Sequence, residues 1–316
     1  MANGEFPKHF DGRRFYNPDA PQARGFLEAL RWKLTSRPEP SPGSVLDVEQ
    51  TIPPRNVEDS QIRITLVNHS TVLIQRAGFN LLTDPIWSER ASPLSWIGPK
   101  RRRKPGVRLE DLPPIDAVLV SHNHYDHLDL PTLRHLAARG GCTFVVAARG
   151  AHLLRSEKIE PVSELDWGDS LNISGVSIHS VPALHFSARG ILDRNKTLWC
   201  GYVVKHADQL VYFAGDTGFG NHFAQIRERF GAPNLALLPI GAYEPRWFMS
   251  PVHMSPEEAV KAHTILDAKR SIAIHHGTFQ LADEAIDSPQ KQLHACRHDD
   301  SFMILKNGQF ATILDN

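Results

Sequence analysis

The strongest constraint on this chain is the segment VSHNHYDHLDL at residues 120–130, which holds three histidines and an aspartate within positions 122–127. PPIDAVLV precedes it, an apolar and β-branched run that predicts a buried strand. PTLRHLAARGG follows it and predicts a helix, with Pro131 near its start and Gly140 and Gly141 at its end. Polar side chains in a loop from a buried strand to a helix are placed for function. The pattern therefore predicts an α/β fold with a site at this loop.

The spacing of these side chains favours a metal site. On an α-helix, His122 and His124 would face opposite ways. In an extended and then turning loop they point the same way, and the turn returns Asp126 and His127 toward them. Imidazole and carboxylate ligands together favour Zn²⁺ or another borderline metal over Ca²⁺ and Mg²⁺. Four ligands so close in sequence crowd one ion, so we expect two ions and further ligands downstream.

Three later segments offer such ligands at the ends of predicted strands. Asp216 follows the apolar run VYFA, and His185 lies just past the segment SVPAL. His275 and His276 end the strand SIAI and, by strand alternation, point to opposite faces. Each signal is weak alone, but sites of α/β proteins lie at this edge of a sheet.

Composition narrows the class of protein. The chain has 316 residues, 41% of them hydrophobic, and 35 basic side chains balance 35 acidic ones. This balance suits a globular protein and argues against a nucleic-acid binder with a broad basic face. Cys142, Cys200 and Cys296 form no metal-binding pattern and suit reduced thiols. The polar N-terminus and the lack of a long apolar run predict a cytoplasmic protein, with peripheral membrane contact left open.

Two regions are expected along the chain. Residues 1–60 form an N-terminal extension with one amphipathic helix, whose apolar stripe holds Phe26, Leu27, Leu30 and Leu34. Packing of this helix on the body is favoured over a membrane or partner contact. Residues 61–316 form the main domain. It begins with two strands joined at Ala77 and Gly78, and it alternates strands and helices in two series, which predicts an α/β protein of two layered halves.

The chain resembles the metallo-β-lactamase superfamily of dinuclear hydrolases in the order of four motifs. These are HxHxDH, a single later histidine, the aspartate of GDT and a histidine at a strand end. The segments IGPKR, GAYEPRWFM and AIHHGTF resemble, more narrowly, N-acyl-phosphatidylethanolamine-hydrolysing phospholipase D and its bacterial relatives. This resemblance runs from about residue 62 to residue 310. It implies a four-layer αββα sandwich, which agrees with the two predicted series.

The resemblance also implies seven metal ligands in two groups that share one bridging carboxylate. They are His122, His124 and His185 for one zinc ion, Asp126, His127 and His275 for the other, and Asp216 between them. Two such ions lower the pKa of a shared water and supply hydroxide at neutral pH. No separate serine or cysteine nucleophile is then required.

Catalytic or supporting roles are assigned to four residues. We give catalytic roles to Asp126 and to His253, which lies just before the predicted capping box SPEE and can serve the leaving group or the phosphate. Asp84 in LLTDP is expected to support a ligand histidine, although a turn role is nearly as favoured. His69 either lines the site or is a core histidine, and the core role is slightly favoured.

Substrate contacts are predicted around the same site. Residues 100–104 form a basic run, KRRRK, whose default interpretation is a solvated loop. Arg101 and Arg102 would instead bind an anionic head group there. Tyr243 and Trp247 would contact apolar chains, and His276 would line the pocket wall.

The favoured function is a dinuclear zinc phosphodiesterase that cleaves N-acyl-phosphatidylethanolamine-like lipids to phosphatidic acid and N-acylethanolamine. The alternatives are a hydrolase of a soluble phosphodiester or a phosphorylated sugar lactone and, less favoured, a non-catalytic metal- or lipid-binding module. The expected partners are a phospholipid or small phosphodiester and a membrane surface, without nucleic acid. A homodimer is one candidate assembly.

Overall fold

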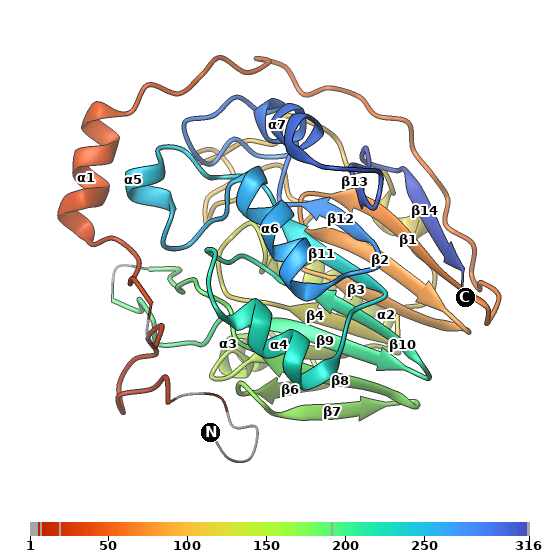
Figure 1. Ribbon diagram of the computed structural model, residues 1–316. Helices are drawn as coiled ribbons and strands as arrows, with labels where there is room; N and C mark the ends of the chain where they lie inside the picture. The colour runs from red at the N-terminus through yellow and green to blue at the C-terminus, as the bar shows by residue number, and fades with distance from the viewer. Residues whose placement is uncertain (1–5, 7, 19, 191, 315–316) are drawn as a thin grey trace.

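The computed structural model describes residues 6, 8–18, 20–190 and 192–314. Two seven-stranded sheets pack face to face, and helices cover their outer faces (Figure 1). The predicted αββα sandwich is confirmed. No helix in the described part of the chain is long and apolar enough to cross a membrane.

The first sheet is mixed and has the strand order β14-β1-β2-β3-β4-β5-β6. Its strands are β1 Gln61–Asn68, β2 Thr71–Arg76, β3 Phe79–Thr83, β4 Ala117–Val120, β5 Thr143–Ala147, β6 Val162–Leu165 and β14 Phe310–Leu314. From β3 to β6 the strands run parallel. The C-terminal strand β14 closes this sheet by pairing antiparallel with β1.

The second sheet has the order β13-β12-β11-β10-β9-β8-β7. Its strands are β7 Ser170–Ile173, β8 Val176–Val181, β9 Gly201–His206, β10 Gln209–Phe213, β11 Leu235–Pro239, β12 Ser271–Ile274 and β13 Phe302–Met303. Strands β10 to β13 are parallel, so the ends of β10, β11 and β12 lie at one edge of the sheet.

The helices are α1 Phe26–Thr35, α2 Leu130–Arg139, α3 Ala151–Ser156, α4 His222–Phe230, α5 Arg246–Met249, α6 Pro256–Leu266 and α7 Ser288–Cys296, with a 3-10 turn at Leu109–Asp111. Pro131 stands in the first turn of α2 and Gly140 caps its end, as predicted. Ser255 and Glu258 form the predicted capping box of α6.

Alternation along buried strands explains the four layers. In β4, Ala117 and Leu119 point between the sheets, while Val118 and Val120 pack with α2 and α3 on the outer side. In the second sheet, Leu237 points between the sheets and Leu238 packs with α4 and α6. Strands buried on both faces carry continuous apolar runs.

The structure corrects the expected strand count at the start of the domain. The segment 62–83 forms three strands because the chain turns at His69 as well as at Ala77 and Gly78. His69 has a φ of 49°, in the left-handed region that ends a strand. The sequence signal was the polar triplet of Asn68, His69 and Ser70 inside an apolar run.

The helix α1 forms where predicted, but its predicted packing face is wrong. Trp32 stacks on Phe248 of α5 with ring centroids 4.9 Å apart, and its Nε1 donates to Asp283. The apolar stripe faces solvent instead, and Phe26 and Leu27 are each 79% exposed. The following segment crosses the molecule from α1 to β1 along the top of the sheets (Figure 1).

Candidate metal centre

Three histidine rings converge at the edge where β4 and β8 end. His122 and His124 follow β4 directly, and His185 lies in the loop after β8. His122 Nε2 lies 2.8 Å from His124 Nδ1, and His185 Nε2 lies 3.1 Å from the same nitrogen. This is the first ligand group, and it brings together the three residues predicted for one ion.

Beside it, a second group surrounds two carboxylate oxygens. Asp126 Oδ2 lies 3.2 Å from His127 Nε2 and 3.3 Å from His275 Nε2. Asp216 Oδ2 lies 3.2 Å and 3.0 Å from the same two nitrogens. Such separations suit ligand atoms that share an ion with bonds of about 2.0–2.2 Å. His275 follows β12 and Asp216 follows β10, both in the second sheet. Asp126 and His127 lie in the loop after β4 of the first sheet, so both sheets contribute ligands.

Asp216 lies between the two groups. Its Oδ2 contacts the second group and is also 3.9 Å from His185 Nε2 of the first group. Gly215 before it has a φ of 61°, and a Cβ there would lie 2.7 Å from the Cβ of Ser121. Glycine therefore lets the Asp216 loop approach the loop after β4. The predicted bridging position of Asp216 agrees with this geometry.

The pKa values of the histidines shift in opposite directions in the two ligand groups. Burial lowers the pKa of His124 to about 3 and that of His185 to about 4, so both rings are neutral at pH 7. In the second group, burial alone lowers the pKa of His275, but the carboxylates of Asp216 and Asp126 raise it to about 9. The second group thus holds two carboxylates that require positive charge, which a divalent cation can supply.

The donor set fits metal ions. All seven predicted ligands offer nitrogen or oxygen atoms, without sulfur, and six of the seven are buried. Among the residues that the structure describes, His127 Nε2 and Asp216 Oδ1 have no hydrogen-bond partner, although buried polar atoms normally have one. Coordination would satisfy both atoms.

Buried partners orient the ligand rings. Asp84 Oδ2 accepts from His127 Nδ1 at 2.6 Å and from Ser121 Oγ at 2.6 Å. Ser121 Oγ also lies 2.9 Å from His122 Nδ1, so one carboxylate supports ligands of both groups. The predicted supporting role of Asp84 agrees with these contacts.

Comparison with known proteins agrees with this fold and site. The family profile described as a beta-lactamase superfamily domain matches residues 79–276, more than half of the chain. The chain belongs to the metallo-β-lactamase superfamily. It is a metal-dependent hydrolase by this membership and by the names of its relatives.

The hydrolase has similar relatives over most of its length. N-acyl-phosphatidylethanolamine-hydrolyzing phospholipase D 1 of Caenorhabditis elegans is 38% identical over 295 residues, which cover 87% of this chain and 81% of that protein. A metal-dependent hydrolase of Methanopyrus kandleri is 30% identical over 252 residues, with 78% and 98% covered. The isothiocyanate hydrolase from Delia radicum gut bacteria is 21% identical with a TM-score of 0.65, covers 80% of this chain and 99% of that one, and shares the fold.

His253 borders the metal centre of the hydrolase. Its Nδ1 lies 3.9 Å from Asp216 Oδ2, and its ring centroid is 5.1 Å from that of His185. Nδ1 makes no hydrogen bond within the described residues. Burial lowers the pKa of His253 well below its ordinary value, so the ring is neutral at pH 7. A neutral ring suits a hydrogen bond to substrate better than proton donation.

The basic run is not one exposed patch, which contradicts the predicted position of Arg101 on the rim. Arg101 is 4% exposed, and its guanidinium donates to the carbonyls of Ser88 and Ile86. Arg103 donates to Gly277 O and pairs with Asp287. Lys104 pairs with Asp47 at 2.7 Å and Lys100 with Glu89 at 3.9 Å, so Arg102 is the member of the run that remains a candidate for contact with an anion. The run packs along the loop after β12 because backbone groups there accept its donors.

The other predicted substrate residues lie in different settings. His276 is buried, with Nε2 at 3.1 Å from Ala273 O and Nδ1 at 2.9 Å from Gln290, which contradicts its predicted contact with substrate. Tyr243 is buried and its hydroxyl makes no hydrogen bond within the described residues. Trp247 is 40% exposed on α5 and stacks beneath Arg31 of α1.

Two neighbours of the site were missed by sequence reasoning or underrated by it. Asn17 of the N-terminal extension is buried and donates to His185 O at 2.9 Å. No local sequence pattern predicts this contact, because Asn17 and His185 lie far apart in the sequence. His69 lies 3.0 Å from Asp126, within hydrogen-bond distance of a predicted ligand. Its buried position agrees with the core role, and its contact places it at the site as well.

Proposed function

We propose that this hydrolase holds two zinc ions and cleaves N-acyl-phosphatidylethanolamine-like lipids as a phospholipase D-type phosphodiesterase, giving phosphatidic acid and N-acylethanolamine. The observation that carries the proposal is the pair of buried ligand groups on either side of Asp216. The relative from Caenorhabditis elegans supports the substrate class, since its name states that activity.

The residues of the chain divide the chemistry between binding and positioning. His122, His124 and His185 would hold one ion, and Asp126, His127 and His275 the other, with Asp216 shared. Bound zinc ions lower the pKa of water and neutralise charge on phosphoryl oxygens. Asp84 and Ser121 orient the rings, and His253 offers a hydrogen bond to a phosphate oxygen or to the leaving alcohol.

Helix α1 supports a lipid substrate. Its exposed apolar stripe is joined to the site through α5, because Arg24 Nε donates to Trp247 O and Arg246 Nη1 donates to His253 O. An exposed apolar helix face on a segment that also carries Arg24, Arg31 and Lys33 suits an anionic membrane surface. We propose peripheral membrane contact through this face.

Room for substrate lies beside the ligand loop. A cavity of about 540 Å³ is lined by residues that include Leu94, Tyr125, Leu130 and Arg189. Tyr125 belongs to the loop after β4, and the Arg189 guanidinium lies 3.9 Å from its ring centroid. The lining also includes the carboxylates of Glu89 and Asp129, and its apolar and arginine side chains suit the acyl and phosphate parts of a lipid.

The test is turnover of N-acyl-phosphatidylethanolamine in vesicles by zinc-loaded protein in ¹⁸O-labelled water. Mass analysis should find N-acylethanolamine without label and phosphatidic acid with one labelled oxygen, since water replaces the alcohol on phosphorus. The Asp216→Asn variant is the control. Rapid hydrolysis of a soluble phosphodiester or a phosphorylated sugar lactone, without lipid turnover, would overturn the lipid assignment in favour of a hydrolase of soluble substrates.

A further inference from the structure

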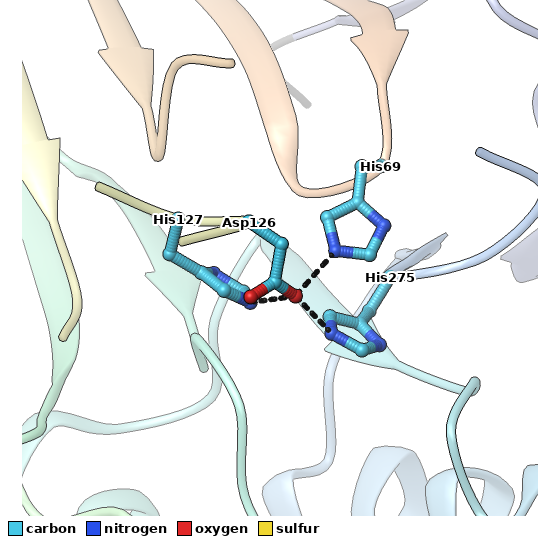
Figure 2. A group of neighbouring side chains, drawn as sticks. All are labelled: His69, Asp126, His127 and His275. Carbon is cyan, nitrogen blue, oxygen red and sulfur yellow. Dashed lines mark hydrogen bonds and ion pairs between the residues drawn. The ribbon is translucent and has the colours of Figure 1, made fainter. Parts of the chain in front are cut away.

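His69 precedes all of the predicted ligands in the sequence, and its side chain contacts the second ligand group. It lies in the turn between β1 and β2, and its ring points at Asp126, as Figure 2 shows. His69 Nε2 lies 3.0 Å from Asp126 Oδ2, and the side chain is 1% exposed. The contact is therefore shielded from water and constrains the carboxylate.

Asp126 Oδ2 is the meeting point of three imidazoles. His127 Nε2 and His275 Nε2 approach the same oxygen at 3.2 Å and 3.3 Å (Figure 2). These two rings are assigned to the second ion together with Asp126, whereas His69 has no assigned role. Carboxylates that bind metals are usually held by a further hydrogen bond, which fixes their orientation.

The backbone of His69 is held to the loop that carries His275. His275 N donates to His69 O at 3.0 Å, and His69 N donates to Thr278 Oγ1 at 2.9 Å. The rings of His69 and His275 lie 4.2 Å apart between centroids. His69 thus joins the first sheet to a ligand at the end of β12 in the second sheet.

The conformation of His69 indicates that its place is strongly determined. A φ of 49° is in the left-handed region, which residues other than glycine rarely adopt. Two backbone hydrogen bonds and the ring contact with Asp126 hold it there. Strained residues of this kind gather at functional sites.

We propose that His69 is a positioning residue that donates its Nε2–H to Asp126 and so sets the affinity of the second metal ion. The donor orients Asp126 Oδ2 toward His127 and His275. The backbone of His69 keeps the His275 loop in register with that carboxylate. This inference rests on the proposed two-ion site and is independent of which substrate the enzyme takes.

The experiment compares His69→Asn with His69→Gln. Asparagine tolerates the left-handed backbone but is too short to replace Nε2, whereas the amide of glutamine reaches about that position. Metal-stripped proteins are titrated with Co²⁺ alone, and binding is followed by calorimetry and visible absorption. His276→Asn is the matched control, because it is a buried neighbouring histidine whose ring contacts Ala273 and Gln290.

We expect His69→Asn to weaken one of the two Co²⁺ binding steps by about 10- to 100-fold and to change its absorption band. His69→Gln should recover most of the affinity, and His276→Asn should match wild type. Equal weakening of both steps, unchanged binding in His69→Asn, or no recovery in His69→Gln would each overturn the proposal. Thermal unfolding of the stripped proteins checks their folding. If His69→Asn does not fold, His69→Ser takes its place. Weakening of one step alone then upholds the proposal, and weakening of both steps or of neither overturns it.

These outcomes are separable from the proposed lipid activity. Normal Co²⁺ binding in His69→Asn would remove the positioning role and leave the lipid assignment untouched. Absence of lipid turnover by wild-type protein that binds two Co²⁺ ions would remove the lipid assignment and leave the positioning role of His69 untouched.

Discussion

Asp84 Oδ2 and His127 Nδ1 form a hydrogen bond of 2.6 Å in which both side chains are fully buried. The bond fixes the tautomer of His127 and leaves Nε2 facing Asp126 and Asp216. A second carboxylate behind a ligand histidine raises the basicity of the ring. Asp84 thus acts on the site through His127 directly and through His122 by way of Ser121.

Replacing Asp84 with asparagine should weaken metal binding by about 10- to 100-fold, because the amide keeps the shape but loses the charge. Titration of stripped protein with Zn²⁺ against a chromogenic chelator measures the change. Asp116→Asn is a matched control, since Asp116 accepts from Asn80 N on the same sheet. Wild-type affinity in Asp84→Asn would remove Asp84 from the site.

Asp216→Asn should reduce the metal content of purified protein from two ions per chain toward one. Its Oδ2 contacts both ligand groups, and an amide cannot supply the bridging negative charge. Elemental analysis measures the content, and turnover of an aryl phosphodiester measures activity. One ion in the wild-type protein, with activity retained in the variant, would refute the bridging role.

His253→Ala should lower kcat by less than about 100-fold, because the variant loses a hydrogen bond to the phosphate or the leaving alcohol; a larger loss would instead indicate proton donation by the ring. Metal content should stay at the wild-type value, because His253 is outside the assigned ligand set. Steady-state kinetics with metal analysis of the same sample distinguishes the cases. Loss of metal would make His253 a ligand or its support.

The stability of the protein should fall in mild acid in part through His222. Burial lowers the pKa of His222 to about 3, and Thr217 Oγ1 lies 3.1 Å from its Nε2. Below the ordinary pKa of about 6.5, the unfolded chain takes up a proton that the folded chain does not. The free energy of unfolding therefore decreases as the pH is lowered. At pH 5.5 the proton uptake by His222 in the unfolded chain lowers the free energy of unfolding by about 1.4 kcal/mol.

Denaturant unfolding of metal-stripped protein at pH 7 and pH 5.5 measures that loss. The variant His222→Asn should lose less stability between the two pH values than wild type. An equal loss in both proteins would show that His222 does not contribute.

Leu27→Gln with Leu34→Gln should lower turnover of vesicle-borne lipid and leave a soluble phosphodiester unaffected. Both side chains are nearly four-fifths exposed, so the changes cost little stability. The same substitution at Leu314, which is also exposed but lies on β14 at the opposite end of the molecule (Figure 1), is the control. Vesicle co-sedimentation measures binding directly. Equal vesicle binding by all three proteins would contradict a membrane role for α1.

The ligand loop could be predicted because its information is local. A buried strand, a short loop and a helix placed His122, His124, Asp126 and His127 at a strand end, and the geometry of parallel sheets places other strand ends beside it. Asp216, His185 and His275 were found by the same rule. Their sharing of one cluster follows from the packing of two sheets whose ligand-bearing edges meet.

The sequence by itself determined which elements form and which strand ends carry ligands, since periodicity and turn chemistry act over a few residues. The tertiary structure alone decided the direction of individual side chains. Arg101 turns inward because carbonyls of Ser88 and Ile86 accept its donors, and α1 exposes its apolar stripe because Trp32 makes the contact with α5. His69 meets Asp126 only after strands β1 to β4 have assembled into the first sheet, and no local pattern encodes a contact between residues that far apart.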